Sequence, residues 1–121
     1  MKKKVLIVED EESLLKLESI LLTTKGYDVR AVASGRAALE ALEEELSDLV
    51  LLDVMLPEMD GFEVCRRIKA NPKTAHIPVV MLTAKKTAED MARGDEVGAD
   101  RYITKPFKSA MVIETMEQLL S

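Results

Sequence analysis

The sequence predicts an α/β fold, a doubly wound parallel sheet of five strands with helices on both faces. Runs with strand character alternate five times with runs of helical character, and such alternation is typical of crossover units. The run from Leu49 to Leu52 is wholly apolar, which suits a strand buried on both faces of a parallel sheet. The chain has 121 residues, the length of one domain, so we expect residues 1–121 to form a single domain.

The expected elements follow one another as strand, then helix, throughout the chain. Gly26 is placed to end the first helix and Ser34 to cap the second. Asp60 and Glu63 have the spacing of a capping box at the third helix, and Thr87 caps the fourth. The second strand alternates polar and apolar residues, so we expect it at an edge of the sheet. The expected strands cover residues 5–8, 28–33, 49–52, 79–82 and 102–104, and the expected helices cover residues 12–25, 36–45, 62–70, a segment after 87, and a segment from 108 or 109 to 120.

Apolar side chains at helical spacing mark the helix faces that we expect to be buried. The fourth helix has only a thin apolar face, made by Ala88, Met91 and Ala92, and Gly94 and Gly98 loosen its end. We therefore expect it to be weakly anchored, either as a mobile switch element or as an ordinary surface helix. The other predicted faces are Leu14, Leu17 and Leu21 in the first helix, Leu39, Leu42 and Leu46 in the second, Val64, Cys65 and Ile68 in the third, and Val112, Met116 and Leu119 in the last.

Composition and charge argue against several classes of function. The formal net charge of −5 is unlike that of nucleic-acid-binding modules, which usually carry a basic surface. No apolar run approaches the roughly 20 residues of a membrane span, and the segment after the basic start is too short for a secretion signal. Cys65 is the only cysteine, which excludes an internal disulfide and fits a reducing compartment. We therefore expect a cytoplasmic domain that binds neither nucleic acid nor membranes.

Polar residues follow the apolar runs at their carboxyl ends. They are Glu9 and Asp10 after the first run, Asp53 after the third, Thr83 after the fourth and Lys105 after the fifth. Each one, taken alone, could be a solvated strand end. Parallel strands end at one edge of a sheet, where open α/β sheets bind ligands, so we expect the five side chains to meet. Three clustered carboxylates repel one another unless a cation lies among them, so the cluster predicts a metal site.

The residue types at this edge suit phosphoryl chemistry. Oxygen donors favour Mg²⁺, which commonly binds one or two carboxylates together with phosphate oxygens, whereas a zinc site uses histidine or cysteine. With the metal bound, a carboxylate oxygen of Asp53 can attack phosphorus and give an aspartyl phosphate. Lys105 supplies a positive charge and Thr83 a hydrogen-bond donor for the phosphoryl oxygens. The small Ala84 leaves room at the backbone.

The same residues resemble the motifs of a known family, the receiver domains of bacterial two-component response regulators. The likeness covers essentially the whole chain, and the ordered set of motifs is more specific than any one of them. It implies a flavodoxin-like sheet with the strand order 2-1-3-4-5. The matching motifs are Val8-Glu9-Asp10, Asp53 with Pro57 and Asp60-Gly61 behind it, Thr83-Ala84, and Lys105-Pro106-Phe107.

The resemblance implies a role for each residue of the site. Glu9 stands where many relatives carry aspartate, so one arm of the implied metal site is longer here while its charge is kept. The implied assignments are Asp53 as phosphoacceptor, Glu9, Asp10, Asp53 and the Met55 backbone carbonyl as Mg²⁺ ligands, Thr83, Ala84 and Lys105 as phosphoryl contacts, Thr83 and Tyr102 as the switch pair, and a cis peptide bond between Lys105 and Pro106.

The resemblance implies a signalling switch rather than an enzyme with a separate substrate. A sensor histidine kinase or a phosphotransfer protein would pass a phosphoryl group to Asp53, and the chain would catalyse its own phosphorylation and dephosphorylation. Thr83 and then Tyr102 would move inward and change the face formed by the fourth helix, the fifth strand and the fifth helix. That face would bind a downstream protein target, an output domain or a second copy of the chain.

Three other functions remain open. A magnesium phosphohydrolase would use Asp53 as a turnover nucleophile, but such enzymes commonly carry a second acid two positions later, where this chain has Met55. A phosphate-independent interaction module would keep the fold and the acids without accepting a phosphoryl group. A nucleotide-binding domain is less well supported, since no glycine-rich loop follows the first strand.

Overall fold

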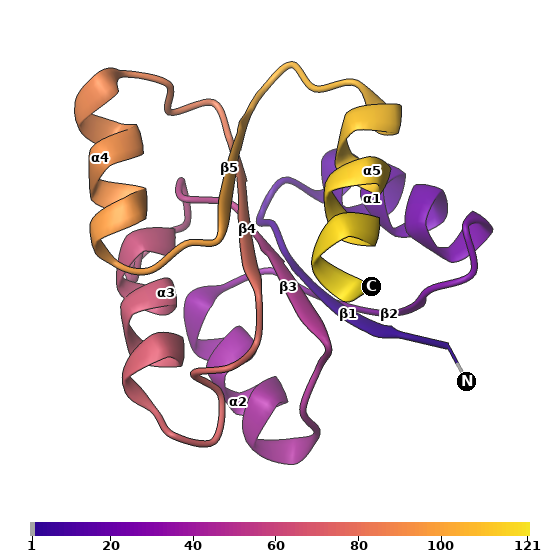
Figure 1. Ribbon diagram of the computed structural model, residues 1–121, viewed down its shortest axis with the longest axis horizontal. Coiled ribbons are helices and arrows are strands. Elements are labelled where there is room, and N and C mark those ends of the chain that lie inside the picture. Colours follow the sequence, from indigo (N-terminus) through magenta and orange to yellow (C-terminus); the bar gives the residue numbers. More distant parts are fainter. Residues whose placement is uncertain (1) are drawn as a thin grey trace.

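A computed structural model describes residues 2–121 and confirms the predicted architecture (Figure 1). Within that range, five parallel strands form one sheet in the order β2-β1-β3-β4-β5, which the family resemblance implied. The strands are β1 (Lys4–Val8), β2 (Asp28–Val32), β3 (Leu49–Leu52), β4 (Val79–Thr83) and β5 (Arg101–Thr104). The helices are α1 (Glu12–Thr24), α2 (Gly35–Glu44), α3 (Gly61–Ala70), α4 (Ala88–Glu96) and α5 (Ser109–Leu120).

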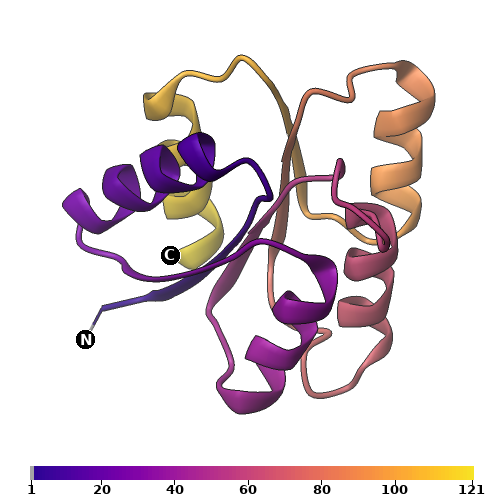
Figure 2. The same cartoon turned by 180° about the vertical axis from the view of Figure 1, so that it is seen from behind.

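Helices cover both faces of the sheet. Figures 1 and 2 show α1 and α5 together on one face and α2, α3 and α4 on the other. Two apolar clusters fill the space between these layers, one built on Leu6, Val50 and Met81 and the other on Ile7, Leu51 and Val80. Consecutive residues of one strand therefore supply opposite clusters, as the period of two in a β-strand requires. None of the helices described in residues 2–121 is long and apolar enough to cross a membrane.

Burial differs between the central strands and the edge as the sequence predicted. All residues of β3 and β4 are buried, whereas β2 at the edge has no buried residue: Val29 and Val32 are half-buried and the others are exposed. A strand with neighbours on both sides and helices on both faces has no solvent-facing position, so its sequence can be wholly apolar. The carboxyl ends of all five strands lie at the same edge of this sheet, because every pair is parallel.

The predicted buried face of α1 is only partly right: Leu21 packs against the core as expected, but the fully buried residues lie on a neighbouring stripe. Leu17 is 58% exposed, and the buried residues of the helix are Glu18 and Leu22. Leu15, three residues before Glu18, packs against the same cluster as Leu22. Because leucines occupy neighbouring positions around this helix, the sequence alone does not decide which of them face the core. Packing against the sheet buries the stripe that contains Glu18.

Two further predictions of burial are also wrong. Leu46 lies beyond the end of α2 and is 47% exposed, so only Leu39 and Leu42 of that stripe face the core. In α4 the side chains of Ala88, Met91 and Ala92 face solvent. The buried residue of α4 is Gly94, whose lack of a side chain lets the helix approach the ring of Tyr102. A small residue therefore marks the contact face here, which an apolar-periodicity argument overlooks. Gly94 was expected to loosen the helix.

Side-chain caps begin three of the helices where the sequence placed them. Ser34 accepts a hydrogen bond from the Ala37 backbone N–H, and Thr87 forms a full capping box with Asp90. Asp60 accepts from the backbone N–H of Glu63, but the box predicted there is only half formed. The Glu63 carboxylate pairs with Arg66 and Arg67 instead of turning back to Asp60.

Gly61, at the start of α3, is a site of close backbone approach. A Cβ atom at this position would lie 2.7 Å from the Cα atom of Val54 and closer still to the carbonyl oxygen of Asp53. Because both neighbours are backbone atoms, they have no rotamer that relieves the overlap. We expect Gly61→Ala to lower the free energy of unfolding by about 1–3 kcal/mol, measured by urea denaturation.

Gly26 provides the matched control for this substitution. A Cβ there would meet nothing within 4 Å, and only the positive φ of +93° opposes an alanine. Gly26→Ala should therefore lose about 1 kcal/mol. If Gly61→Ala is as stable as Gly26→Ala, or more stable, the close contact between Gly61 and the backbone of Asp53 and Val54 does not limit this position.

Candidate phosphoryl-transfer site

Strand register brings the predicted site residues to one edge of the sheet. Val8 of β1 lies opposite Leu52 of β3, so the residues that follow these two strands are neighbours. The Asp53 backbone N–H donates to the Val8 carbonyl at 3.0 Å. On the other side of the site, the Lys105 backbone N–H donates to the Thr83 carbonyl at 2.8 Å. Backbone hydrogen bonds between the strand ends thus fix the positions of the Cα atoms that carry the site's side chains.

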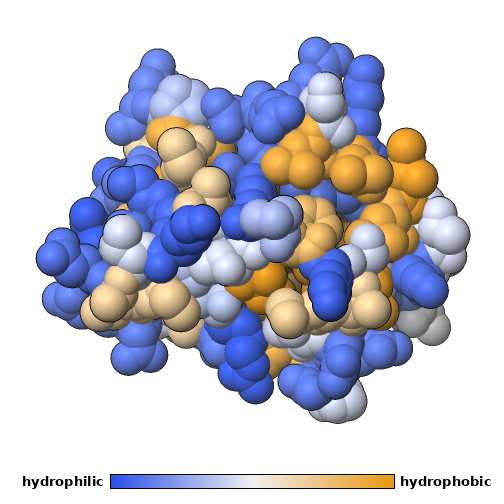
Figure 3. Space-filling view, turned by 90° about the horizontal axis from the view of Figure 1, so that it is seen from above, coloured by the Kyte–Doolittle hydropathy of each residue, from blue (hydrophilic) through white to orange (hydrophobic). Residues whose placement is uncertain are grey.

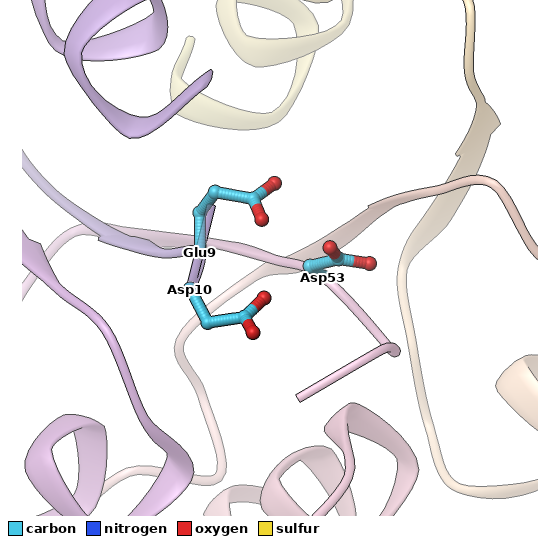
Figure 4. A group of neighbouring side chains, drawn as sticks. All are labelled: Glu9, Asp10 and Asp53. Carbon is cyan, nitrogen blue, oxygen red and sulfur yellow. The ribbon is translucent and has the colours of Figure 1, made fainter. Parts of the chain in front are cut away.

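Three carboxylates meet at this edge. Oxygen atoms of Glu9, Asp10 and Asp53 all lie within 4.8 Å of one another (Figure 4). Glu9 and Asp53 are buried, whereas Asp10 is exposed. Figure 4 shows the side chains of Glu9 and Asp10 leaving the end of β1 on opposite sides. Burial of acids so close together is unfavourable unless positive charge or hydrogen-bond donors compensate it.

Lys105 supplies that positive charge. Its Nζ atom donates to Glu9 Oε1 at 2.7 Å and to Asp53 Oδ2 at 3.2 Å. Burial lowers the pKa of Lys105, but the Glu9 hydrogen bond and the Asp53 charge outweigh it, and the net direction is upward. Burial raises the pKa of Glu9, and the Lys105 hydrogen bond opposes this shift in part. The ammonium therefore stays charged and holds residues from the first, third and fifth strand ends together.

The cluster fits a small divalent cation. Its donors are carboxylate oxygens, which are the ligands that Mg²⁺ prefers, and no sulfur or imidazole lies in the group found in residues 2–121. The exposed Asp10 gives the group an open side, and Mg²⁺ usually keeps several waters. The site also holds an ammonium in hydrogen-bond contact with two of the acids, so a cation there would compete with Lys105 for Glu9 and Asp53.

Among the remaining predicted residues, Met55 contacts an acid, whereas Thr83 contacts the loop after β4. Asp53 Oδ1 accepts from the Met55 backbone N–H at 3.1 Å, which orients the carboxylate. The buried Thr83 hydroxyl accepts from the Lys85 backbone N–H at 3.3 Å, and Ala84 beside it is exposed. The peptide bond between Lys105 and Pro106 is cis. The acids and Lys105 thus form one hydrogen-bonded group, and the Thr83 hydroxyl bonds to the loop that follows β4.

Tyr102 lies next to that loop. Its hydroxyl donates to the Lys85 carbonyl at 2.6 Å, and its ring lies against Gly94 of α4. The Lys85 carbonyl accepts a hydrogen bond from the Tyr102 hydroxyl, and the Lys85 N–H donates one to the Thr83 hydroxyl. One residue of the β4–α4 loop therefore links Thr83 and Tyr102.

Sequence reasoning missed one acid near the site, Glu18 of α1. The residue is 3% exposed, and burial followed by the charge of Glu9 raises the pKa of Glu18 to about 8. Its position three residues after Leu15 and four before Leu22 was the available signal, because that spacing places it in an apolar stripe.

Comparisons with known proteins agree with this geometry. A family model described as a response regulator receiver domain matches residues 5–117. The chain is 43% identical over 120 residues to the alkaline phosphatase synthesis transcriptional regulatory protein PhoP of Bacillus subtilis, covering 99% of this chain and 49% of that protein. It is 40% identical over 119 residues to the response regulator PleD of Caulobacter vibrioides, covering 98% of this chain and 26% of that one. The chain thus spans about half the length of PhoP and about a quarter of the length of PleD.

Solved structures are similar over the whole chain. The chemotaxis protein CheY4 of Vibrio cholerae superposes with a TM-score of 0.94 at 32% identity, covering 99% of this chain and 100% of that one. The receiver domain of the sensor histidine kinase PA1611 of Pseudomonas aeruginosa superposes with a TM-score of 0.92 at 29% identity, covering 99% of this chain and 98% of that one. That structure has a magnesium ion coordinated in its active-site cleft. Fold, strand order and family match therefore agree, and the chain belongs to the receiver domains of response regulators.

Proposed function

We propose that the chain is a phosphorylation switch whose phosphoacceptor is Asp53. A carboxylate oxygen of Asp53 attacks the phosphorus of a donor, the bond from phosphorus to the leaving atom breaks, and the leaving group departs with the electron pair. The observation that carries the proposal is the Lys105 ammonium, shared between Asp53 and Glu9 at hydrogen-bond distance. A fixed positive charge at the acceptor carboxylate is suited to the charge that develops on a phosphoryl group in transfer.

We assign a Mg²⁺ site to Glu9, Asp10, Asp53 and the backbone carbonyl of Met55. The support is the oxygen-only donor set and its open side at Asp10. When bound, the ion would supply positive charge that neutralises the carboxylates and the phosphoryl oxygens. The related PA1611 receiver domain carries such an ion in its cleft.

Three residues of this chain are assigned to the phosphoryl oxygens. Lys105 would contact them through its ammonium and Thr83 through its hydroxyl, and the exposed Ala84 leaves its backbone N–H accessible. Thr83 would have to turn its hydroxyl from the Lys85 backbone N–H toward the phosphoryl group. That turn is the first movement of the proposed switch.

The second movement is that of Tyr102. The hydrogen bond from its hydroxyl to the Lys85 carbonyl ties the ring to the loop that Thr83 also contacts, so a rearranged loop would release the ring. The output is then a change in the face formed by α4, β5 and α5. This face suits a protein partner, an output domain or a second copy, since α4 presents Ala88, Met91 and Ala92 to solvent.

The partners follow from this chemistry. A sensor histidine kinase or phosphotransfer protein would donate the phosphoryl group, and the chain itself would catalyse transfer and later hydrolysis without turning over a separate substrate. A net charge of −5 disfavours direct nucleic-acid binding by this domain, so any DNA-directed output belongs to another domain or protein. We expect this signalling to take place in the cytoplasm.

Incubation with a small acyl phosphate tests the proposal. With Mg²⁺ present, intact-mass measurement should show one added phosphoryl group, and a chelator should prevent the addition. An unchanged mass in the presence of Mg²⁺ would refute the proposal. Release of many equivalents of phosphate per chain from simple phosphate esters would favour a phosphohydrolase instead.

A further inference from the structure

Glu18 occupies a position in α1 that packing would assign to an apolar side chain. It is 3% exposed, with Leu15 one turn before it and Leu22 one turn after it, and both leucines pack against the same cluster. Its Oε2 atom is the one buried side-chain nitrogen or oxygen in residues 2–121 that lacks a hydrogen-bond partner. An unpaired buried carboxyl group destabilises a fold, so this position does not serve stability.

Glu18 lies on the face of α1 that packs against the sheet, since Leu15 and Leu22 on either side of it pack against the cluster that Val5 and Ile7 of β1 supply. After burial, the charge of Glu9 is the next cause that raises the pKa of Glu18, and the charge of Lys105 lowers that pKa. Glu9 leaves the end of β1 on the side of the sheet where the ribbons of α1 and α5 pass (Figure 4). Glu18 and Glu9 therefore approach from the helix and from the strand on the same face of the sheet, with the Lys105 ammonium bonded to Glu9.

A divalent cation at the site creates a conflict for Lys105. The two acceptors of its ammonium are oxygens of Glu9 and Asp53, which are also ligands of the proposed Mg²⁺ site. A cation on those oxygens competes with the ammonium for their lone pairs and repels its positive charge. The Lys105 side chain is only 16% exposed, so water cannot fully replace the lost acceptors. The ammonium then needs another acceptor inside the protein, and Glu18 Oε2 is a free one.

We propose that Glu18 is a positioning residue of this site, whose buried carboxyl group accepts a hydrogen bond from the Lys105 ammonium when a divalent cation occupies the oxygens of Glu9. The inference rests on the proposed function, because it requires the cation to bind at Glu9. Burial raises the pKa of Glu18 to about 8, so the group carries a proton at neutral pH while Lys105 stays on Glu9. A protonated carboxyl group still has one bare oxygen, so it can accept in either protonation state. The bond to Glu18 thus holds the Lys105 ammonium in a fixed position inside the protein until a phosphoryl group arrives.

Two substitutions at Glu18 separate this role from a general effect of charge. Glu18→Gln keeps an acceptor oxygen in the same place, whereas Glu18→Met fills the same volume without one. Neither change should prevent folding, since both remove an ionisable group from the core. Leu22→Met is the matched control, because it alters packing one turn away on the same buried face and touches no acceptor.

The measurements are the Mg²⁺ dissociation constant, by calorimetric titration, and the ¹⁵N resonance of the Lys105 ammonium by NMR. Wild type, Glu18→Gln and Leu22→Met should bind Mg²⁺ similarly, with ammonium protons that remain protected from exchange after the cation is added. Glu18→Met should bind about two- to tenfold more weakly, the worth of one hydrogen bond, and its ammonium protons should exchange rapidly in the bound state.

The outcomes distinguish the two proposals. Wild type that fails to bind Mg²⁺ overturns the metal assignment and this inference with it. Wild type that binds while Glu18→Met keeps the same affinity and the same ammonium resonance overturns only the role of Glu18. Equal weakening in Glu18→Gln and Glu18→Met also overturns it, since the amide retains the acceptor oxygen.

Discussion

Replacing Asp53 by asparagine is expected to abolish phosphorylation of the chain. The amide has no ionised oxygen to attack phosphorus, although it has the same shape and can still accept the Met55 backbone N–H at Oδ1. Loss of one buried carboxylate also leaves Lys105 with Glu9 as its ionic partner, so the fold should be retained. Intact mass after incubation with an acyl phosphate and Mg²⁺ should show no added phosphoryl group, against one in wild type.

Asp28→Asn is the control for this experiment. Asp28 is an exposed aspartate at the start of β2, at the opposite edge of the sheet from the site, and it should label as wild type does. Labelling of Asp53→Asn to the wild-type extent would place the acceptor elsewhere. Unchanged partner binding by the unlabelled variant would instead favour a phosphate-independent interaction module.

Stability should fall as pH rises because of Glu18. Its pKa is about 8 in the folded chain and 4.5 in a solvated one. Below pH 4.5 both states hold the proton and Glu18 has no effect on pH dependence. Between pH 4.5 and 8 the unfolded chain has lost the proton and the folded chain keeps it, so the free energy of unfolding drops by about 1.4 kcal/mol per pH unit. Above pH 8 the loss is complete and stays constant.

Glu18→Met removes this titration and isolates its effect. The difference in unfolding free energy between the variant and wild type should grow by on the order of 4 kcal/mol from pH 4.5 to pH 8, a large part of a typical domain's stability. Urea denaturation of both chains across that range gives the difference directly, and other titrating groups cancel in it. Two stability curves that run parallel would show that the Glu18 carboxyl group does not keep its proton on folding.

The fold was predictable because its local signals agree with its topology. The wholly apolar run at Leu49–Leu52 favours a strand covered on both faces, and β3 is such a strand. The caps at Ser34 and Thr87 fixed the starts of two helices, since a hydroxyl bonds backbone groups only a few residues away. The order of the strands is a tertiary property, and it came from the family resemblance.

Helix faces were less predictable, for two physical reasons. In α1 the leucines form one broad stripe, so sequence spacing offers both Leu14-Leu17-Leu21 and the set Leu15 and Leu22, and only contact with the sheet decides which side chains are buried. In α4, the buried contact is made by a glycine, which contributes no apolar signal. The hydrophobic pattern identifies only positions with apolar side chains. A helix can also pack closely where a residue has no side chain, as α4 does at Gly94.

The clustering of the acids with Lys105 was predictable from the sequence, whereas the hydrogen bonds within the cluster were not. Parallel strand ends share one edge, so Glu9, Asp53 and Lys105 could be placed together without knowing a single distance. The acceptors of Lys105 depend on rotamers, which no sequence motif specifies. Glu18 enters from a helix packed over the edge rather than from a strand end, so the topological argument did not include it.

Assembly of the site has a temporal consequence during synthesis. The acids come from the first half of the chain and the ammonium from residue 105, and their contacts span 96 and 52 residues. A nascent chain that has emerged only as far as α4 carries the crowded carboxylates without the lysine that compensates them. The amino-terminal strands should then pair weakly, and the complete five-stranded sheet and the chemical competence of the site should arise together when β5 and the segment after it leave the ribosome.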